Sequence, residues 1–128
     1  ADGGGYDLLV RHVGGSKQPF ETATAGETKH FLYMDGKPVF KWAVRLVEEN
    51  MREVVGAAGL TLDEIKLVVL HQANVRILHG IADALKLDHA KVAVQLDRYG
   101  NTSAGSIPLA LEECVSQGRV RRGDAILM

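Results

Sequence analysis

The run Leu67-Val68-Val69-Leu70 constrains the fold more than any other part of the sequence. Four consecutive apolar residues are typical of a strand that is buried within a sheet. The segment from Val75 to Leu85 follows it, and its apolar residues recur with the spacing of an amphipathic helix. The sequence therefore predicts a strand, a turn and a helix in succession, with His71 at the carboxyl end of the strand. In open α/β sheets, ligands bind at such strand ends.

Further segments show strand or helix patterns of the same kind. From residue 38 onward the predicted strands and helices alternate, so the predicted fold class is α/β. We expect strands at 6–13, 31–34, 66–70, 92–96 and from 125 onward, and helices at 38–58, at 75–85 and from Ser103 or Ser106 to about residue 117. The polar stretch 17–29 is predicted to be a surface loop.

Several residues mark where the predicted helices begin and end. Pro38 suits the first turn of a helix, and Gly59 is typical of a residue that ends one. Thr61 and Glu64 have the spacing of a capping box, and Asn74 is a favourable N-cap. The predicted inner face of helix 38–58 contains Phe40, Val44, Val47, Met51, Val54 and Ala58, and that of the last helix contains Ile107, Leu111 and Cys114.

The composition limits the class of protein and its partners. The 128 residues, 46% of them hydrophobic, suffice for one domain with a core. Fifteen basic and sixteen acidic residues give a net charge of -1, which does not favour a nucleic acid partner. No apolar run reaches the roughly 18 residues that a membrane span needs. The single cysteine favours a reducing, cytoplasmic location. Strand-like runs close to both ends lead us to expect a piece of a longer protein.

Two polar residues, His71 and Asn101, stand out as candidates for chemistry. Asn101 follows Gly100 in a glycine-containing loop ahead of the last predicted helix. A neutral imidazole could donate an N–H to an oxygen that gains negative charge, or it could act as a general base. The Asn101 amide could supply a second donor to the same oxygen. Both residues also have purely structural interpretations, since a histidine between a buried strand and a helix cap is often structural and Gly-Asn turns are common.

Other motifs with known chemistry are missing or weak. His71 and His79 lie eight residues apart without the Glu of a His-Glu-x-x-His zinc motif. The sequence has no phosphate-binding loop and no Gly-x-Ser-x-Gly elbow. Cys114 falls on the apolar face of a predicted helix, which favours a packed core thiol over a nucleophile. We therefore expect no metal site.

Five blocks of the sequence resemble the β-ketoacyl-acyl carrier protein synthase III family of condensing enzymes. The blocks follow one another in the order found in the family. Two of them are His71 to Ile77 and Leu96 to Ala104. The other three are Asp2-Gly3 with Asp7-Leu8-Leu9, Met34-Asp35-Gly36 with Val39-Phe40-Lys41, and Ile107 to Leu111. The resemblance implies a thiolase-like fold of two α/β halves, of which this chain resembles the C-terminal half. It also implies that the nucleophilic cysteine lies in the other half, so that this chain alone is inactive.

The resemblance implies a decarboxylative condensation between a short acyl-CoA and malonyl-acyl carrier protein, which initiates type II fatty acid synthesis. His71 and Asn101 match the catalytic histidine and asparagine, as two neutral donors to the malonyl thioester oxygen. The resemblance also implies a homodimer that needs no cofactor. Its substrates would be acyl-CoA and the malonyl-loaded acyl carrier protein. Gly36, Phe40 and Asn74 match the pantetheine tunnel, and Lys41 and Arg76 match the basic rim that meets the carrier protein.

Two alternatives to this interpretation remain open. A related acyltransferase or a polyketide-priming synthase would keep the fold and change the substrate. A free-standing half could instead serve, without catalysis, as a module for carrier-protein docking or dimerisation.

Overall fold

The computed structural model describes residues 3–20 and 30–128, and the predicted loop at 17–29 therefore lies largely outside the described residues. The chain divides into two compact units, residues 1–42 and 43–128, which are considered in turn. Among the described residues, no helix has the length and apolar character needed to cross a membrane.

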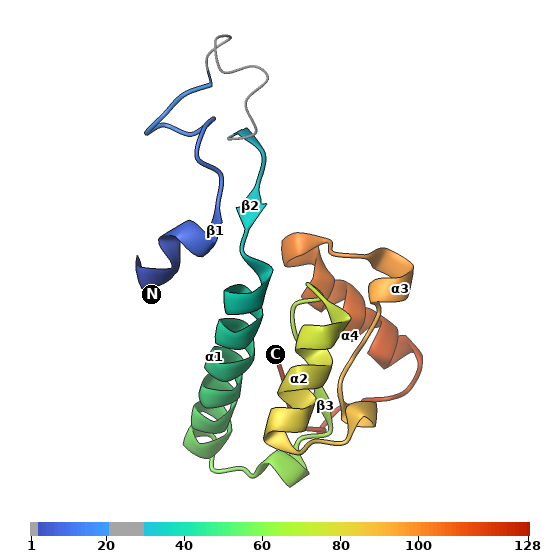
Figure 1. Cartoon of the computed structure of the whole chain (residues 1–128). Coiled ribbons are helices and arrows are strands. Elements are labelled where there is room, and N and C mark those ends of the chain that lie inside the picture. The colour runs from blue at the N-terminus through green and yellow to red at the C-terminus, as the bar shows by residue number, and fades with distance from the viewer. Residues whose placement is uncertain (1–2, 21–29) are drawn as a thin grey trace. The chain divides into compact units, whose positions relative to one another are not determined.

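The first unit contains a short antiparallel ladder between β1 (Leu9–Val10) and β2 (Tyr33–Met34), which Figure 1 shows side by side. A 3-10 helix, η1 (Gly3–Leu8), precedes β1, so the predicted strand at 6–13 is wrong in most of its length. Glycine is unfavourable in strands, and the run Gly3–Gly5 favours a turn instead. The ladder ends at the Asp35 N–H, which donates to the Leu8 carbonyl over 2.8 Å.

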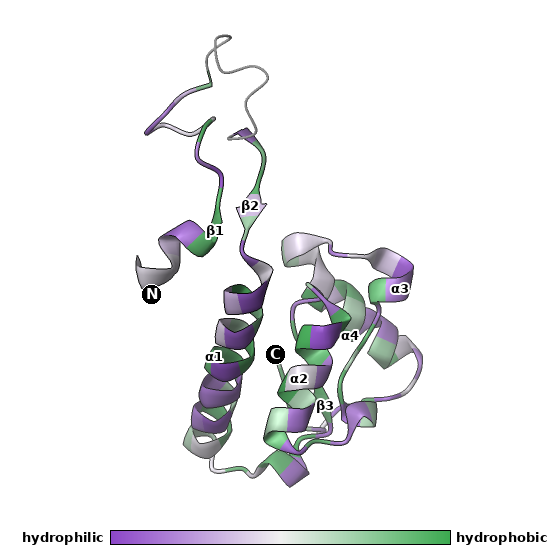
Figure 2. Cartoon of the chain, viewed as in Figure 1, coloured by the Kyte–Doolittle hydropathy of each residue, from purple (hydrophilic) through white to green (hydrophobic). Residues whose placement is uncertain are grey.

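Helix α1 (Gly36–Ala57) confirms the predicted helix and its end signal. Gly59 has a φ of +69°, and the Leu60 N–H donates to the Val55 carbonyl at 3.1 Å. This is the hydrogen bond of a Schellman motif, which only a left-handed residue such as glycine allows cheaply. The predicted inner face was wrong at Phe40, Val54 and Ala58, which are exposed, and it missed Val55, which is buried. Figure 2 shows the apolar and polar residues of α1 on different faces.

The second unit is built on β3 (Leu67–Val68), which pairs in parallel with β4 (Ile126–Leu127). On its other edge Val68 forms a parallel bridge with Val92, and the Ala93 N–H donates to the Val68 carbonyl at 2.9 Å. The predicted strand at 92–96 is therefore reduced to one bridge, and the chain turns into the short helix α3 (Leu96–Tyr99). This arrangement confirms the α/β class.

Helices cover both faces of this small sheet. One core cluster joins Val68 to α2 (Val75–Leu85) and to Met51 and Val55 of α1. The other joins Leu67 and Val69 to α4 (Ser106–Ser116). Because successive strand residues face opposite sides, this double cover explains why every residue of the run 67–70 is apolar.

The face of α4 differs from the prediction. Its buried residues are Ser106, Ala110, Glu113 and Cys114, whereas Ile107 and Leu111 are only partly buried. Two of the four buried side chains are polar, so the apolar pattern alone pointed to a neighbouring face of the helix. Cys114 is fully buried, which confirms its expected place in the core.

The predicted capping box opens the short 3-10 helix η4 (Leu62–Glu64). The N–H and the hydroxyl of Thr61 both donate to the Glu64 carboxylate, at 2.8 and 2.7 Å. These hydrogen bonds favour the charged carboxylate and lower the pKa of Glu64 below its usual value. A further 3-10 helix, η5 (His89–Lys91), is capped by Asp88, whose carboxylate accepts from the Ala90 N–H.

Two neighbouring valines of α1 provide a test of the observed helix face. Val55→Ala should lower the free energy of unfolding by about 1–3 kcal/mol, because it removes two buried methyl groups and leaves a cavity. Val54→Ala makes the same change at an exposed position and should stay within about 0.5 kcal/mol of the parent. Urea unfolding of the protein that contains this chain measures both. Equal losses for the two variants would contradict the assigned face.

Candidate active site

His71 follows β3 in the turn that leads into α2. The turn is closed by Asn74, whose side-chain oxygen accepts the Arg76 N–H at 2.9 Å, as the N-cap prediction requires. A second hydrogen bond joins the Ala73 N–H to the His71 carbonyl at 3.0 Å. The imidazole is thus held at the carboxyl end of the most buried strand, where the sequence placed it.

Asn101 lies in the loop between α3 and α4, and its backbone depends on Gly100. Gly100 has φ +65° and ψ -160°, a region that is essentially restricted to glycine. No atom lies within 4 Å of a Cβ built there, so the requirement comes from the backbone and not from crowding. The Asn101 side-chain oxygen accepts the Ser103 N–H at 3.1 Å. This hydrogen bond occupies the oxygen and leaves the amide Nδ2 as a donor.

Ser106 joins these two loops. Its hydroxyl oxygen lies 2.7 Å from Nδ1 of His71, and it also accepts the Gln72 N–H at 3.1 Å. The same hydroxyl donates to the Ser103 carbonyl at 2.9 Å. Ser106 is buried and is the first residue of α4. His71 and Asn101 are therefore connected through Ser106 and Ser103 by three hydrogen bonds.

The prediction that Ser103 or Ser106 caps the last helix was wrong, and the contact of Ser106 with His71 was not predicted. The N-cap position of α4 is Gly105, and the hydroxyl of Ser106 bonds to the two loops instead. A serine at a helix start carries a strong local signal for capping, which hid its long-range contact with His71.

Each proposed catalytic side chain keeps one polar atom available. Nδ1 of His71 faces Ser106 and the oxygen of Asn101 faces Ser103. In the part of the chain that the structure describes, Nε2 of His71 and Nδ2 of Asn101 have no partner, and both side chains are exposed. Each residue therefore offers one nitrogen atom that could contact an oxygen or a proton of a ligand.

The other residues predicted for substrate or carrier binding lie on two helices. Gly36, Phe40 and Lys41 belong to the first turns of α1, within the first unit, and are all exposed. Arg76 is an exposed residue of the first turn of α2, and Asn74 retains its amide nitrogen after capping that helix. All five positions are exposed.

A buried glutamine that the sequence analysis did not consider supports the His71 turn. The Gln72 amide donates to the carbonyls of Leu70 and Ala93, at 2.9 and 3.1 Å, and its oxygen accepts the Gln95 N–H at 3.0 Å. Gln72 therefore completes the pairing between the strand edge and residues 93–95 beyond the point where regular bridges end. These hydrogen bonds make the burial of Gln72 tolerable, since an unpaired amide in the core is costly.

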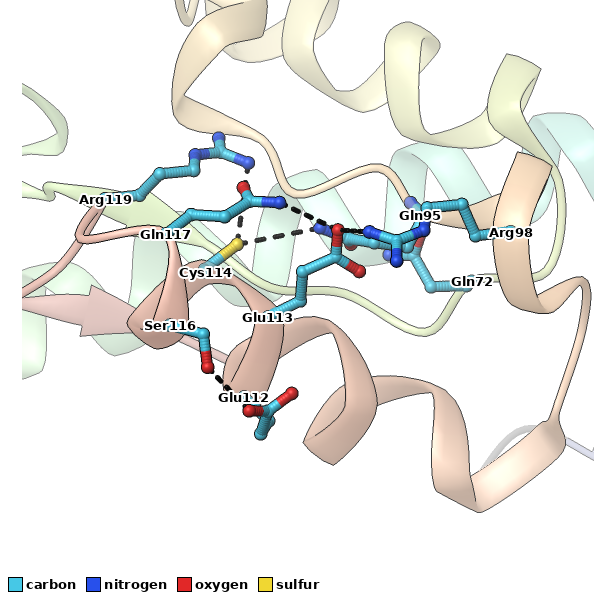
Figure 3. Close-up of polar contacts among 9 residues, drawn as sticks. All are labelled: Gln72, Gln95, Arg98, Glu112, Glu113, Cys114, Ser116, Gln117 and Arg119. Atoms are coloured by element: carbon cyan, nitrogen blue, oxygen red, sulfur yellow. Dashed lines mark hydrogen bonds and ion pairs between the residues drawn. The ribbon is translucent and has the colours of Figure 1, made fainter.

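A buried carboxylate holds the segment that leads to Asn101. Glu113 of α4 forms an ion pair with Arg98 of α3, and the same oxygen accepts from the Gln117 amide at 2.8 Å (Figure 3). The Glu113 side chain is 9% exposed and that of Arg98 is 55% exposed. The ion pair thus fixes α3, three residues before Asn101, onto α4.

Cys114 lies beside other polar side chains of this region and does not belong to a separate site. The Gln95 amide nitrogen lies 3.7 Å from its sulfur, and Arg119 lies 3.5 Å from it while also donating to the Ala90 carbonyl at 2.7 Å. Within residues 3–20 and 30–128, no three His, Cys, Asp or Glu side chains gather as metal ligands.

The parallel sheet, its two helical layers and the loop-borne His71 and Asn101 define a thiolase-like α/β protein. The family model for the C-terminal region of 3-oxoacyl-[acyl-carrier-protein] synthase III matches residues 55–128. The chain belongs to this family, as its sequence blocks predicted.

Known proteins match the chain over nearly its whole length. It is 44% identical over 128 residues to the β-ketoacyl-[acyl-carrier-protein] synthase III of Rhodopirellula baltica, and 47% identical over 127 residues to that of Symbiobacterium thermophilum. It covers 37% and 38% of those proteins, so it spans less than two fifths of their length.

Solved structures agree with this match. The synthase III structure from Thermus thermophilus superposes on 98% of this chain with a TM-score of 0.83 at 44% identity, and the chain covers 38% of it. The synthase III structure from Pseudomonas aeruginosa gives a TM-score of 0.82 at 35% identity over 98% of this chain and 36% of that one.

The backbone of the Asn101 loop can be tested with one substitution. Gly100→Ala should lower the free energy of unfolding by about 1–3 kcal/mol, because a Cβ is disfavoured at this φ and ψ. Gly56→Ala is the matched control: Gly56 lies within α1 with open space around it, and alanine there should be neutral or slightly stabilising. Thermal unfolding of both variants measures the difference. A neutral Gly100→Ala would show that the loop does not need this conformation.

The Arg98–Glu113 pair gives a second test. Arg98→Met leaves a buried carboxylate without its cation and should cost about 1–3 kcal/mol, less than a fully buried pair because Arg98 is half exposed. The double variant Arg98→Met with Glu113→Gln removes the stranded charge and should recover most of the loss. Denaturant unfolding of the two variants decides; a double variant no more stable than the single one would contradict the assigned pairing.

Proposed function

We propose that this chain supplies the histidine and asparagine of the condensing site of a 3-oxoacyl-[acyl-carrier-protein] synthase III. The complete protein would join a short acyl-CoA to malonyl-acyl carrier protein with loss of carbon dioxide. The acylated cysteine would come from the part of the protein outside this chain, and the chain alone would be inactive. This reaction initiates type II fatty acid synthesis.

The observation that supports the proposal best is the hydrogen-bonded path from His71 to Asn101. Residues thirty positions apart in the sequence meet through Ser106 and Ser103, and each presents one nitrogen that the protein itself does not use. A purely structural histidine or a simple Gly-Asn turn would not require such a path between the two loops. The family assignment gives the chemistry to which this pair is suited.

Decarboxylation of a malonyl thioester moves negative charge onto the thioester oxygen. Preoriented N–H groups at that oxygen lower the barrier, because they are arranged before the charge develops. The Asn101 amide, held by the Ser103 N–H, is such a group. A carboxylate in its place would repel the enolate. No step of this chemistry needs a metal or a redox cofactor.

The proposed partners follow from the same assignment. The names of the relatives specify acyl carrier protein, and we propose it as the partner of this protein, with acyl-CoA as the first substrate. Lys41 and Arg76 would meet the acidic carrier protein, where complementary charge mainly speeds encounter. Gly36, Phe40 and Asn74 would line the pantetheine path. We also propose a homodimer that acts in the cytoplasm.

Asn101→Asp in the full-length protein tests the proposal with almost no change in shape. Aspartate keeps the oxygen that accepts the Ser103 N–H and replaces the donor by a negatively charged oxygen. We expect decarboxylation of malonyl-acyl carrier protein to fall by at least about 10²- to 10³-fold, the usual loss for one such donor. His71→Ala should cause a loss of similar size. Release of carbon dioxide from labelled malonyl-acyl carrier protein measures both.

His79→Ala is the matched control, since His79 is an exposed histidine of α2 whose ring contacts His89. It should keep the parent rate. Transfer of the acyl group from acyl-CoA to the enzyme should survive in the Asn101 variant, which would show that the fold is intact. If a folded Asn101→Asp protein decarboxylated at the parent rate, the proposed role of Asn101 would be wrong.

A further inference from the structure

We propose that Arg98, held by the buried carboxylate of Glu113, is a positioning residue that fixes where Asn101 lies in the proposed site. The inference rests on the proposed function, in which the Asn101 amide donates to the thioester oxygen. It goes further by naming the contact that sets the position of this amide, and by giving that contact an effect on the rate of decarboxylation as well as on stability.

The segment that leads to Asn101 has little structure of its own. Helix α3 is a single turn of four residues, and so short a helix is unstable by itself in water. Its first residue, Leu96, packs against the apolar core, whereas Tyr99 is exposed and Gly100 has no side chain. Between Leu96 and Asn101, Arg98 is the only residue whose side chain forms a hydrogen bond or ion pair with a distant segment of the described chain. The end of α3 therefore depends on Arg98.

The partner of Arg98 is a carboxylate in a costly place. The Glu113 side chain is 9% exposed, and one of its oxygens accepts from Arg98 and from the Gln117 amide (Figure 3). Taking a carboxylate out of water is expensive, and an apolar pair in such a place is often equally stable. The position that this pair gives to Arg98 therefore explains it better than a gain in stability does.

Helix α4 holds the Asn101 loop on both sides. Glu113 lies seven residues after Ser106, which is two turns of the helix, so both belong to its buried face. Glu113 binds Arg98, which precedes the loop. In the turn just ahead of α4, the Ser103 N–H donates to the Asn101 oxygen at 3.1 Å. Loss of Arg98 would leave the loop attached to α4 on one side.

The position of the amide matters for the proposed chemistry. A donor lowers the barrier only if it is aimed at the oxygen before negative charge develops there. A misplacement of about 1 Å that is caused far from the reacting atoms can lower a rate by about 10²-fold. A protein without the Arg98 contact would keep the Asn101 amide but hold it less well. Its rate should therefore fall by less than in a protein that lacks the donor.

Arg98→Met in the full-length protein tests the inference. Methionine keeps an unbranched side chain and removes the cation. At a temperature where the variant is folded, kcat for release of carbon dioxide from malonyl-acyl carrier protein should fall about 10-fold, with KM changed by no more than about twofold. Transfer of the acyl group from acyl-CoA should keep its parent rate, because the Asn101 amide has no proposed part in that step.

Two combined variants separate positioning from loss of stability. Arg98→Met with Glu113→Gln removes the stranded charge and should recover stability, but it does not restore the attachment of α3, so kcat should stay low. In a protein that already carries Asn101→Ala, adding Arg98→Met should lower kcat by no more than about twofold, because the side chain that Arg98 positions is gone.

Arg52→Met is the matched control. The Arg52 side chain is 51% exposed, close to the 55% of Arg98, and it forms an ion pair with Glu48 within α1. The same substitution there should leave both half-reactions at the parent rate. Circular dichroism and thermal unfolding identify any variant that does not fold. If Arg98→Met does not fold, the double variant with Glu113→Gln takes its place in every comparison of rates.

Three results would overturn the inference. They are a folded Arg98→Met protein that decarboxylates at the parent rate, a double variant whose rate recovers together with its stability, and a full further loss of rate in the Asn101→Ala background. Asn101→Asp alone decides the proposed role of Asn101. If Asn101→Asp is impaired and Arg98→Met is not, only the positioning role is wrong; if Asn101→Asp keeps the parent rate, the proposed role of Asn101 fails whatever Arg98→Met does.

Discussion

The second unit depends on the burial of β3 on both of its faces. Val68 and Val69 are fully buried, and they face the α1–α2 layer and the α4 layer respectively. A strand without an exposed face needs neighbours at both edges as well as cover above and below, and β4 and Val92 supply those edges. The first polar side chain after this strand is His71, so the imidazole comes at the point where the apolar cover ends.

Buried polar side chains extend this framework to the site. Gln72, Gln95, Ser106 and Glu113 are the buried polar residues of the described chain, and each bonds to a segment distant in the sequence. Because an unpaired polar group in the core is costly, such contacts tolerate few alternative arrangements. They join the turn after β3, the segment 93–98 and α4 at specific positions. Apolar packing alone would allow these segments to slide by a fraction of a turn.

The sequence predicted features whose cause is local or strongly periodic. The helices at 36–57 and 75–85, the Gly59 and Asn74 caps and the Thr61–Glu64 box follow from residue type and spacing. It failed where distant contacts decide. The buried positions 106, 110, 113 and 114 of α4 form a regular helical stripe, but serine and glutamate occupy two of them, so hydrophobic periodicity could not reveal it. The segment 92–96 reads as a strand, yet buried Gln95 and the start of α3 end the pairing after one bridge.

The same reasoning explains why the contact between His71 and Ser106 could not be predicted from the sequence. The position of His71 at a strand end can be seen in the sequence, whereas the group that contacts its ring can be seen only in the structure. The side chains of His71 and Asn101 each use one polar atom for a contact within the protein, and this contact restricts the orientations that the side chain can adopt. Both are held by the segment 103–106, since Ser103 binds the Asn101 oxygen and Ser106 binds the imidazole. The segment 103–106 thus contacts both side chains, and it is the link through which a change near one of them would reach the other.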